Sequence, residues 1–156
     1  MSIVWKYKID LANESVFDEI QNERGIIIPD DLKKLIIEEN AATPDKYNFM
    51  VGSTERVFGT VLSFNKNEED TDTVFTALEV VDDKNLFPFT IDSFGNYICL
   101  DLTTEDVVFW DHETGEVSST QKSLENLLES LYWLVAVAGL ICCITIIGIP
   151  FGKQFF

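Results

Sequence analysis

Two short amphipathic segments joined by a glycine-to-proline connection constrain the fold of this chain more than any other feature. Ser15 opens an S-x-x-D pattern that is typical of a helix N-terminus, and Phe17 and Ile20 then lie on one apolar face. Gly25 can adopt the left-handed backbone conformation that ends a helix. Pro29 presets the backbone for a second helix. The pattern predicts two helices that need another layer to pack against.

The second helix is expected to run from Asp30 to Asn40. Asp30 and Asp31 place negative charge at the positively polarised N-terminus of this helix. Its apolar stripe consists of Leu32, Leu35 and Ile36. Asn40 is the expected end of the helix.

The net charge limits the partners that the chain can bind. Among 156 residues, 27 are acidic and 11 are basic, so the formal net charge is −16. Such a surface repels nucleic acid phosphates and anionic lipid headgroups, and we therefore expect a charged partner to be basic. The alternative is that the acidity only keeps the protein soluble.

The cysteines argue against a domain held together by disulfides or zinc, and the N-terminus argues against a secreted protein. Cys99, Cys142 and Cys143 form no C-x-x-C pair, so neither a disulfide framework nor a structural zinc site is expected. The first ten residues lack the apolar stretch of a signal peptide. We therefore expect the folded part to be cytoplasmic.

Strand-like segments alternate with turns through the middle of the chain. Residues 1–12 alternate loosely between apolar and polar, which indicates a strand or an extended arm. Strands are predicted at 49–51, 57–64, 86–91, 97–102, 107–110 and 116–120, with a polar break at 52–55. Residues 74–81 fit either a short helix capped by Thr71-Asp72 or a strand.

A closing helix completes the predicted domain. Ser123 is a natural N-cap, and the following leucines lie on one face: Leu124, Leu127, Leu128 and Leu131. An N-terminal helix pair, an antiparallel sheet of about four to six strands and a closing helix make an α+β fold. The chain length favours one domain, which we place at residues 1–130.

The order of these segments resembles the SUKH superfamily, the Smi/Knr-like domain, over residues 1–132. Gly25–Lys33 is similar to the family's hydrophobic-Pro-x-x-hydrophobic-Lys entry to the second helix. The other similar segments are Glu39–Ala41, Phe87–Asp101, Val107–Glu113 and Ser123–Leu131. Alanine stands at position 41, where the family usually has glycine.

The resemblance implies a non-catalytic protein-binding module without a cofactor. Bacterial members are mostly immunity proteins that neutralise a toxin by binding it, whereas fungal relatives regulate cell-wall synthesis. The expected partner is a basic toxin domain. The acidic residues predicted to meet it lie in one segment: Glu68, Glu69, Asp70 and Asp72.

Residues 131–156 form a hydrophobic tail. Leu131–Phe151 carries no charge and is long enough to cross a bilayer as one helix, which makes a membrane-anchored acidic adaptor the alternative function. A buried helix or strand pair of the domain is the other structural alternative. Thr145–Gln154 resembles part of the YccF family of small membrane proteins. The chain stops where that family continues, which fits a fusion, a truncated reading frame or chance.

Catalytic and metal chemistry receive little support from the sequence. His112 is the only histidine, and Asp111 and Glu113 beside it would point to alternating sides of an extended chain. The segment 111–115 is therefore predicted to be an exposed turn, and a hydrolase using His112 is the third and least favoured hypothesis. The acidic run at 68–72 lacks the glycine and the closing glutamate of a calcium loop.

Overall fold

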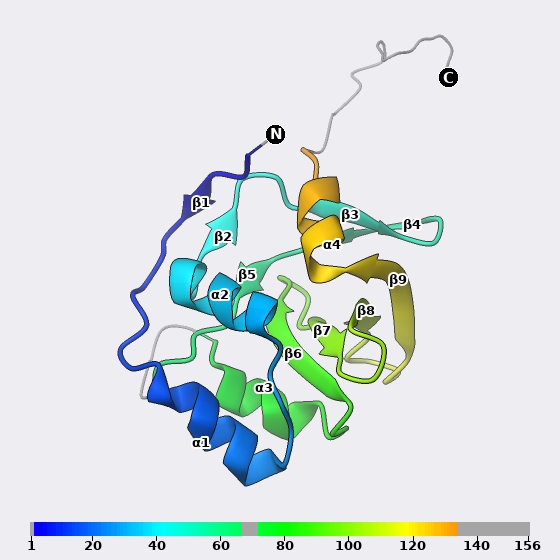
Figure 1. The fold of residues 1–156 in the computed structure, drawn as a ribbon. Coiled ribbons are helices and arrows are strands. Elements are labelled where there is room, and N and C mark those ends of the chain that lie inside the picture. The colour runs from blue at the N-terminus through cyan, green and yellow to red at the C-terminus, as the bar shows by residue number, and fades with distance from the viewer. Residues whose placement is uncertain (1, 67–71, 134–156) are drawn as a thin grey trace, which may run out of the picture.

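The structure is a computed structural model that describes residues 2–66 and 72–133. This part of the chain contains four helices (Figure 1): α1 (Ser15–Arg24), α2 (Asp30–Glu39), α3 (Val74–Val80) and α4 (Leu124–Ser130). Its strands are β1 (Trp5–Lys6), β2 (Thr43–Pro44), β3 (Asn48–Val51), β4 (Thr54–Val57), β5 (Thr60–Val61), β6 (Leu86–Ile91), β7 (Tyr97–Asp101), β8 (Asp106–Trp110) and β9 (Val117–Ser123). The predicted α+β class is confirmed.

One antiparallel sheet carries the fold, and its strand order β5-β6-β7-β8-β9 follows the chain. The predicted sheet size is therefore confirmed. Two smaller ladders, β1 with β2 and β3 with β4, lie outside this sheet. In Figure 1, α4 and the β3–β4 hairpin lie at one end of the molecule, α1 and α3 lie at the other, and α2 lies between them.

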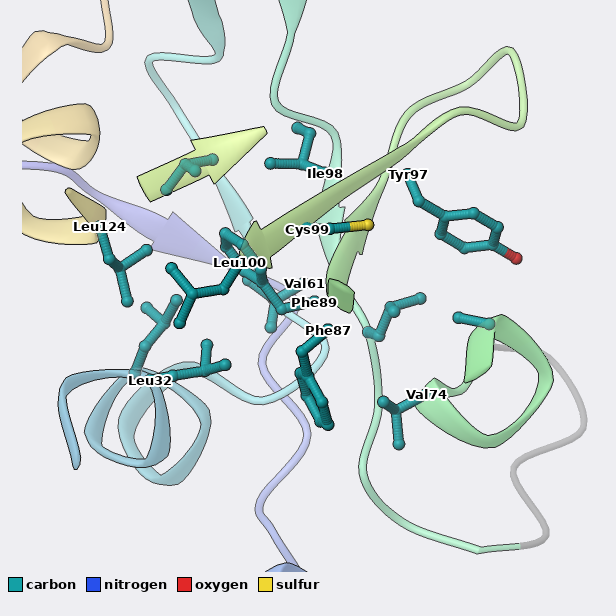
Figure 2. Packing of buried hydrophobic residues seen from close by; sticks show 14 of the residues in the cluster. Leu32, Val61, Val74, Phe87, Phe89, Tyr97, Ile98, Cys99, Leu100 and Leu124 are labelled. Atoms are coloured by element: carbon teal, nitrogen blue, oxygen red, sulfur yellow. The ribbon is translucent and has the colours of Figure 1, made fainter. Parts of the chain in front are cut away.

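The core is a single cluster between the helices and the sheet. Its largest buried side chains include Phe49, Phe58, Phe64, Phe87, Phe89 and Phe109. Figure 2 shows side chains of α2, α3, α4 and the sheet meeting in this cluster. Burial of this apolar surface is the main source of stability.

The predicted connection between the first two helices is confirmed, and Gln21 holds it. Gly25 ends α1 in the left-handed conformation with φ 67°, and its N–H donates to the Gln21 carbonyl oxygen at 2.9 Å. The side-chain oxygen of Gln21 accepts the N–H of Ile28 at 2.9 Å. Pro29 then precedes α2, which ends at Glu39 with the predicted stop, Asn40, as its C-cap.

The predicted cap of α1 is wrong. Glu14, not Ser15, occupies the N-cap position, and no side chain at that position makes a capping hydrogen bond. Instead, the side-chain oxygen of Asn13 accepts the Ser15 N–H at 2.9 Å. An asparagine oxygen readily bonds an N–H two residues further along, so Asn13 displaces the hydroxyl from this role.

Residues 2–12 form an extended arm with only a short strand. Trp5 and Lys6 pair with Pro44 and Thr43. Beyond β1, the side chain of Asn65 holds the arm, because its oxygen accepts the Ala12 N–H at 2.7 Å and its amide donates to a backbone carbonyl of the arm at 2.9 Å.

The prediction for residues 49–64 is partly wrong. Phe49–Val51 is a strand, but the supposed polar break contains the start of β4, since Thr54 pairs with Val51 across a tight turn. The predicted strand 57–64 is interrupted at Gly59, which has φ 78° and lies against the Ile91 carbonyl, where a Cβ atom would overlap it. The main sheet therefore begins only at β5.

The segment that the sequence left open is a helix, so the strand alternative for residues 74–81 is wrong. Its N-cap is Thr73, whose hydroxyl accepts the Thr76 N–H at 3.4 Å, rather than the predicted Thr71-Asp72 pair. Val74, Ala77 and Leu78 are buried, which is the spacing of one helix face.

The chain leaves α4 in an extended conformation. Ser123 caps this helix as predicted, with its hydroxyl accepting the Asn126 N–H at 3.3 Å. Leu131 is buried with φ −65° and ψ 144°, and Tyr132 exchanges two backbone hydrogen bonds of 3.0 Å with Asn48 of β3. The predicted tail helix therefore does not begin at Leu131.

The rest of the predicted tail, from residue 134 onward, lies outside the described residues. Within residues 2–66 and 72–133, no helix has the length and apolar character needed to cross a membrane.

Candidate functional site

A surface groove of about 460 Å³ runs between α2 and α4. One wall is the face of α2 that carries Asp31, Lys34 and Glu38, which lie at the i, i+3 and i+7 spacing of a single helix face. The other wall is the face of α4 that carries Glu125 and Glu129. Both helices bury leucines in the core, and the charged side chains that flank these leucines remain exposed to solvent.

The floor of the groove is apolar. It consists of Leu35 from α2, Leu124 and Leu128 from α4, and Ile3 and Trp5 from the N-terminal arm. Trp5 is itself held by an edge-to-face contact with Phe58, with ring centroids 6.2 Å apart. Three segments that are distant in the sequence therefore make one hollow with apolar side chains below and charged side chains above.

The groove is strongly acidic. Its lining includes five carboxylates, from Asp31, Glu38, Glu39, Glu125 and Glu129, against the single ammonium group of Lys34. None of the five makes an ion pair with a residue that the structure describes. Their charge therefore remains available to a positively charged partner.

Glu39 differs from the other carboxylates of the groove because it is partly buried. Desolvation raises its pKa above the ordinary value, Lys8 opposes this rise, and the neighbouring charge of Glu38 reinforces it. A cation brought close to Glu39 would favour its ionised form.

Of the four residues in the predicted acidic segment, the structure describes only Asp72. Glu68, Glu69 and Asp70 lie outside the described residues. Asp72 is exposed just before α3 and lines a second hollow of about 370 Å³, together with Tyr47 and Gly59. This hollow is separate from the α2–α4 groove, because the two linings share no residue.

His112 lies in the turn between β8 and β9, and the predicted exposed turn at 111–115 is confirmed. Asn96 donates its side-chain amide to Asp92 at 3.0 Å, which directs its oxygen to the Nδ1 atom and the backbone N–H of His112, at 2.8 and 3.0 Å. Asp111 accepts the backbone N–H of Glu113 at 2.8 Å. These side chains hold two adjacent turns together.

No metal site is formed by the part of the chain that the structure describes, since no three histidine, cysteine, aspartate or glutamate side chains converge there. Cys99 is fully buried in β7, and burial raises the pKa of its thiol. A buried thiol with a raised pKa is a poor nucleophile.

Sequence reasoning did not identify the groove. The acidic stripes were readable, because Asp31 and Glu38 share one helix face and Glu125 and Glu129 share another. Their proximity was not readable, because it depends on how the sheet places α4 beside α2. The structure thus adds the groove to the surfaces available for binding.

The fold and the groove together define an α+β domain with an acidic hollow on its surface. The chain belongs to the SMI1 / KNR4 family (SUKH-1), whose sequence profile matches residues 11–130. The predicted SUKH membership is confirmed, while the likeness of the tail to the YccF family stays a prediction. No match to the chain was found among curated proteins.

Proposed function

We propose that this protein is a non-catalytic binding module, an immunity protein that neutralises a bacterial toxin by forming a stoichiometric complex with it. The observation that carries this proposal is family membership across residues 11–130, since SUKH proteins typically bind a protein toxin. Residues 1–130 would form the binding domain, and it would act in the cytoplasm.

The charge of the chain supports a basic toxin domain as the partner. With a net charge of −16, the protein attracts a cationic surface over a range set by the ionic strength. The predicted contact residues Glu68, Glu69, Asp70 and Asp72 would contribute to this attraction. Complementary charge mainly accelerates association and suppresses wrong partners.

Co-expression with a toxin tests the proposal. A candidate toxin, sought first in the genes next to the one for this protein, would be produced with and without this protein, and growth and the mass of the purified complex would be measured. We expect growth to be restored and a complex of defined stoichiometry to be isolated. Toxicity that persists although both proteins accumulate in soluble form would contradict the immunity function.

The ionic strength tests the electrostatic component separately. Raising the salt concentration from about 0.05 to 0.5 M shortens the screening length severalfold, so the association rate should fall. If neither the association rate nor the affinity changes with the salt concentration, the two proteins still bind, but electrostatic attraction does not drive their binding.

A membrane-anchored acidic adaptor is the second candidate, favoured by the uncharged run Leu131–Phe151. In that case the tail would hold the acidic domain at the inner face of the membrane. Cell fractionation distinguishes the two, because an anchored protein needs detergent for extraction. Recovery in the supernatant without detergent would eliminate the anchor.

A further inference from the structure

We propose that the α2–α4 groove is the docking site for a basic amphipathic segment of a protein partner. This inference rests on the proposed function as a toxin-binding module, and it assigns the contact to a surface other than the predicted residues 68–72. The segment would place an apolar side chain on the floor of the groove and lysine or arginine side chains against its walls.

The apolar floor of the groove favours an occupant that carries an apolar side chain as well as positive charge. Leu128, Ile3 and Trp5 are only partly buried, although all three pack against the hydrophobic core. A partner side chain placed over them would remove the remaining apolar surface from water, which is favourable in proportion to the area covered. A small cation could not make this contact, whereas a leucine or phenylalanine side chain could.

The walls set the charge of the occupant. Carboxylates stand on both sides of the floor, with Glu38 on α2 and Glu125 on α4, so a cation on either side of the partner segment meets an acidic side chain. An acidic or neutral occupant would leave five carboxylates facing it with only Lys34 in compensation. Charge complementarity therefore selects a basic segment.

The length of the walls suits a short helix. From Asp31 to Glu39 the helix α2 rises about 12 Å, which corresponds to about two helical turns of a partner laid alongside it. Side chains at i and i+4 on such a partner would follow the floor, and flanking basic residues would reach both walls.

A peptide titration with matched variants tests this proposal. The probe is a synthetic peptide of about twenty residues, longer than the length at which isolated helices are marginal in water, with leucines along one face and lysines flanking them. Its affinity for the full chain would be measured by calorimetry, and its site by backbone amide NMR shifts. We expect the largest shifts on α2, α4 and residues 3–5.

The groove variant is E38Q/E125Q, and its control is E79Q/E116Q. Both remove two negative charges from exposed side chains, but Glu79 and Glu116 lie outside the groove. Since exposed charge pairs contribute at most about 1 kcal/mol each, we expect E38Q/E125Q to weaken peptide binding about three- to tenfold. The control should stay within about twofold of the unmodified protein.

A second peptide, with its leucines replaced by alanines, isolates the apolar contact. It carries the same charge, and we expect it to bind at least about fivefold more weakly because it cannot cover the floor. Equal loss of affinity in both protein variants, equal binding of both peptides, or shifts confined to other surfaces would each overturn the proposal. The first two results would indicate diffuse electrostatic attraction, and the third would indicate a different binding site.

The toxin assay separates this inference from the proposed function. If a toxin is neutralised and E38Q/E125Q binds it as tightly as the unmodified protein does, the groove is not the docking site although the immunity function stands. If no toxin is neutralised but the peptide still occupies the groove, the immunity function fails and the docking site stands.

Discussion

Asn40 and Ile9 are joined by two hydrogen bonds, one in each direction. The Ile9 N–H donates to the backbone carbonyl of Asn40 at 3.0 Å, and the side-chain amide of Asn40 donates to the Ile9 carbonyl at 3.0 Å. The side-chain oxygen of Asn40 also accepts the Phe64 N–H at 2.8 Å. One fully buried side chain therefore fastens the end of α2 to the N-terminal arm and to the segment after β5.

Replacing Asn40 should be costly. The substitution Asn40→Ala leaves the buried N–H of Phe64 and the carbonyl of Ile9 without partners, so we expect a loss of about 2–4 kcal/mol in the free energy of unfolding. Asn126→Ala, on the exposed side of α4, should change it by less than about 0.5 kcal/mol. Urea denaturation measures both, and equal effects would contradict this role of Asn40.

Adjacent alanines should respond differently to glycine. Ala41 has φ 63°, a left-handed conformation that costs a non-glycine residue about 1 kcal/mol. Relief of this strain offsets the extra freedom of glycine in the unfolded chain, so Ala41→Gly should stay within about 0.5 kcal/mol of the unmodified protein. Ala42 is fully buried without positive φ, and Ala42→Gly should cost about 1–2 kcal/mol. Unfolding midpoints that fall equally would exclude strain at Ala41.

Two buried threonines should give opposite results when changed to valine. The hydroxyl of Thr90 is fully buried and has no hydrogen-bond partner among the described residues, so Thr90→Val should stabilise the fold by about 1 kcal/mol. The hydroxyl of Thr120 donates to the Val107 carbonyl at 2.7 Å, and Thr120→Val should destabilise by about 1–2 kcal/mol. Thermal or urea unfolding distinguishes the signs, and a loss in both variants would mean that Thr90 has a partner.

The raised pKa of Glu39 makes a pH-dependent prediction. A carboxyl whose pKa is higher in the folded state binds its proton more tightly there, so its contribution to stability is lost as the pH rises through the folded pKa. Glu39→Gln should therefore be more stable than the unmodified protein at pH 7, and the difference should shrink below the ordinary pKa of 4.5. Urea denaturation at pH 7 and pH 4 measures this, and a difference independent of pH would contradict it.

The sequence was sufficient for most of the fold because local patterns agreed with the tertiary structure. The first helix stops at Gly25, and the second lies between Pro29 and Asn40, as the conformational preferences of these residues predict. Ser123 caps α4 as expected. The sequence did not predict the start of β4, because Thr54 and Glu55 are polar and exposed and owe their extended conformation to pairing with β3.

The candidate site could be predicted only in part. Net charge indicated a basic partner, but the acidity that the structure gathers into a groove comes from helices that were predicted for their buried leucines. Likewise, the sequence shows alanine at position 41 where the family usually has glycine, but the positive φ that would suit glycine there is a property of the folded backbone. Hydrophobic periodicity predicts single helices and strands, but it does not show which distant segments lie side by side in the fold.

The two walls of the groove come from opposite ends of the folded domain's sequence, since α2 ends at Glu39 and α4 begins at Leu124. During synthesis on the ribosome, the first wall emerges long before the second. A nascent chain therefore has no complete docking surface until nearly all of the domain has been made. Binding of a partner in this groove would therefore occur only after the whole domain has folded.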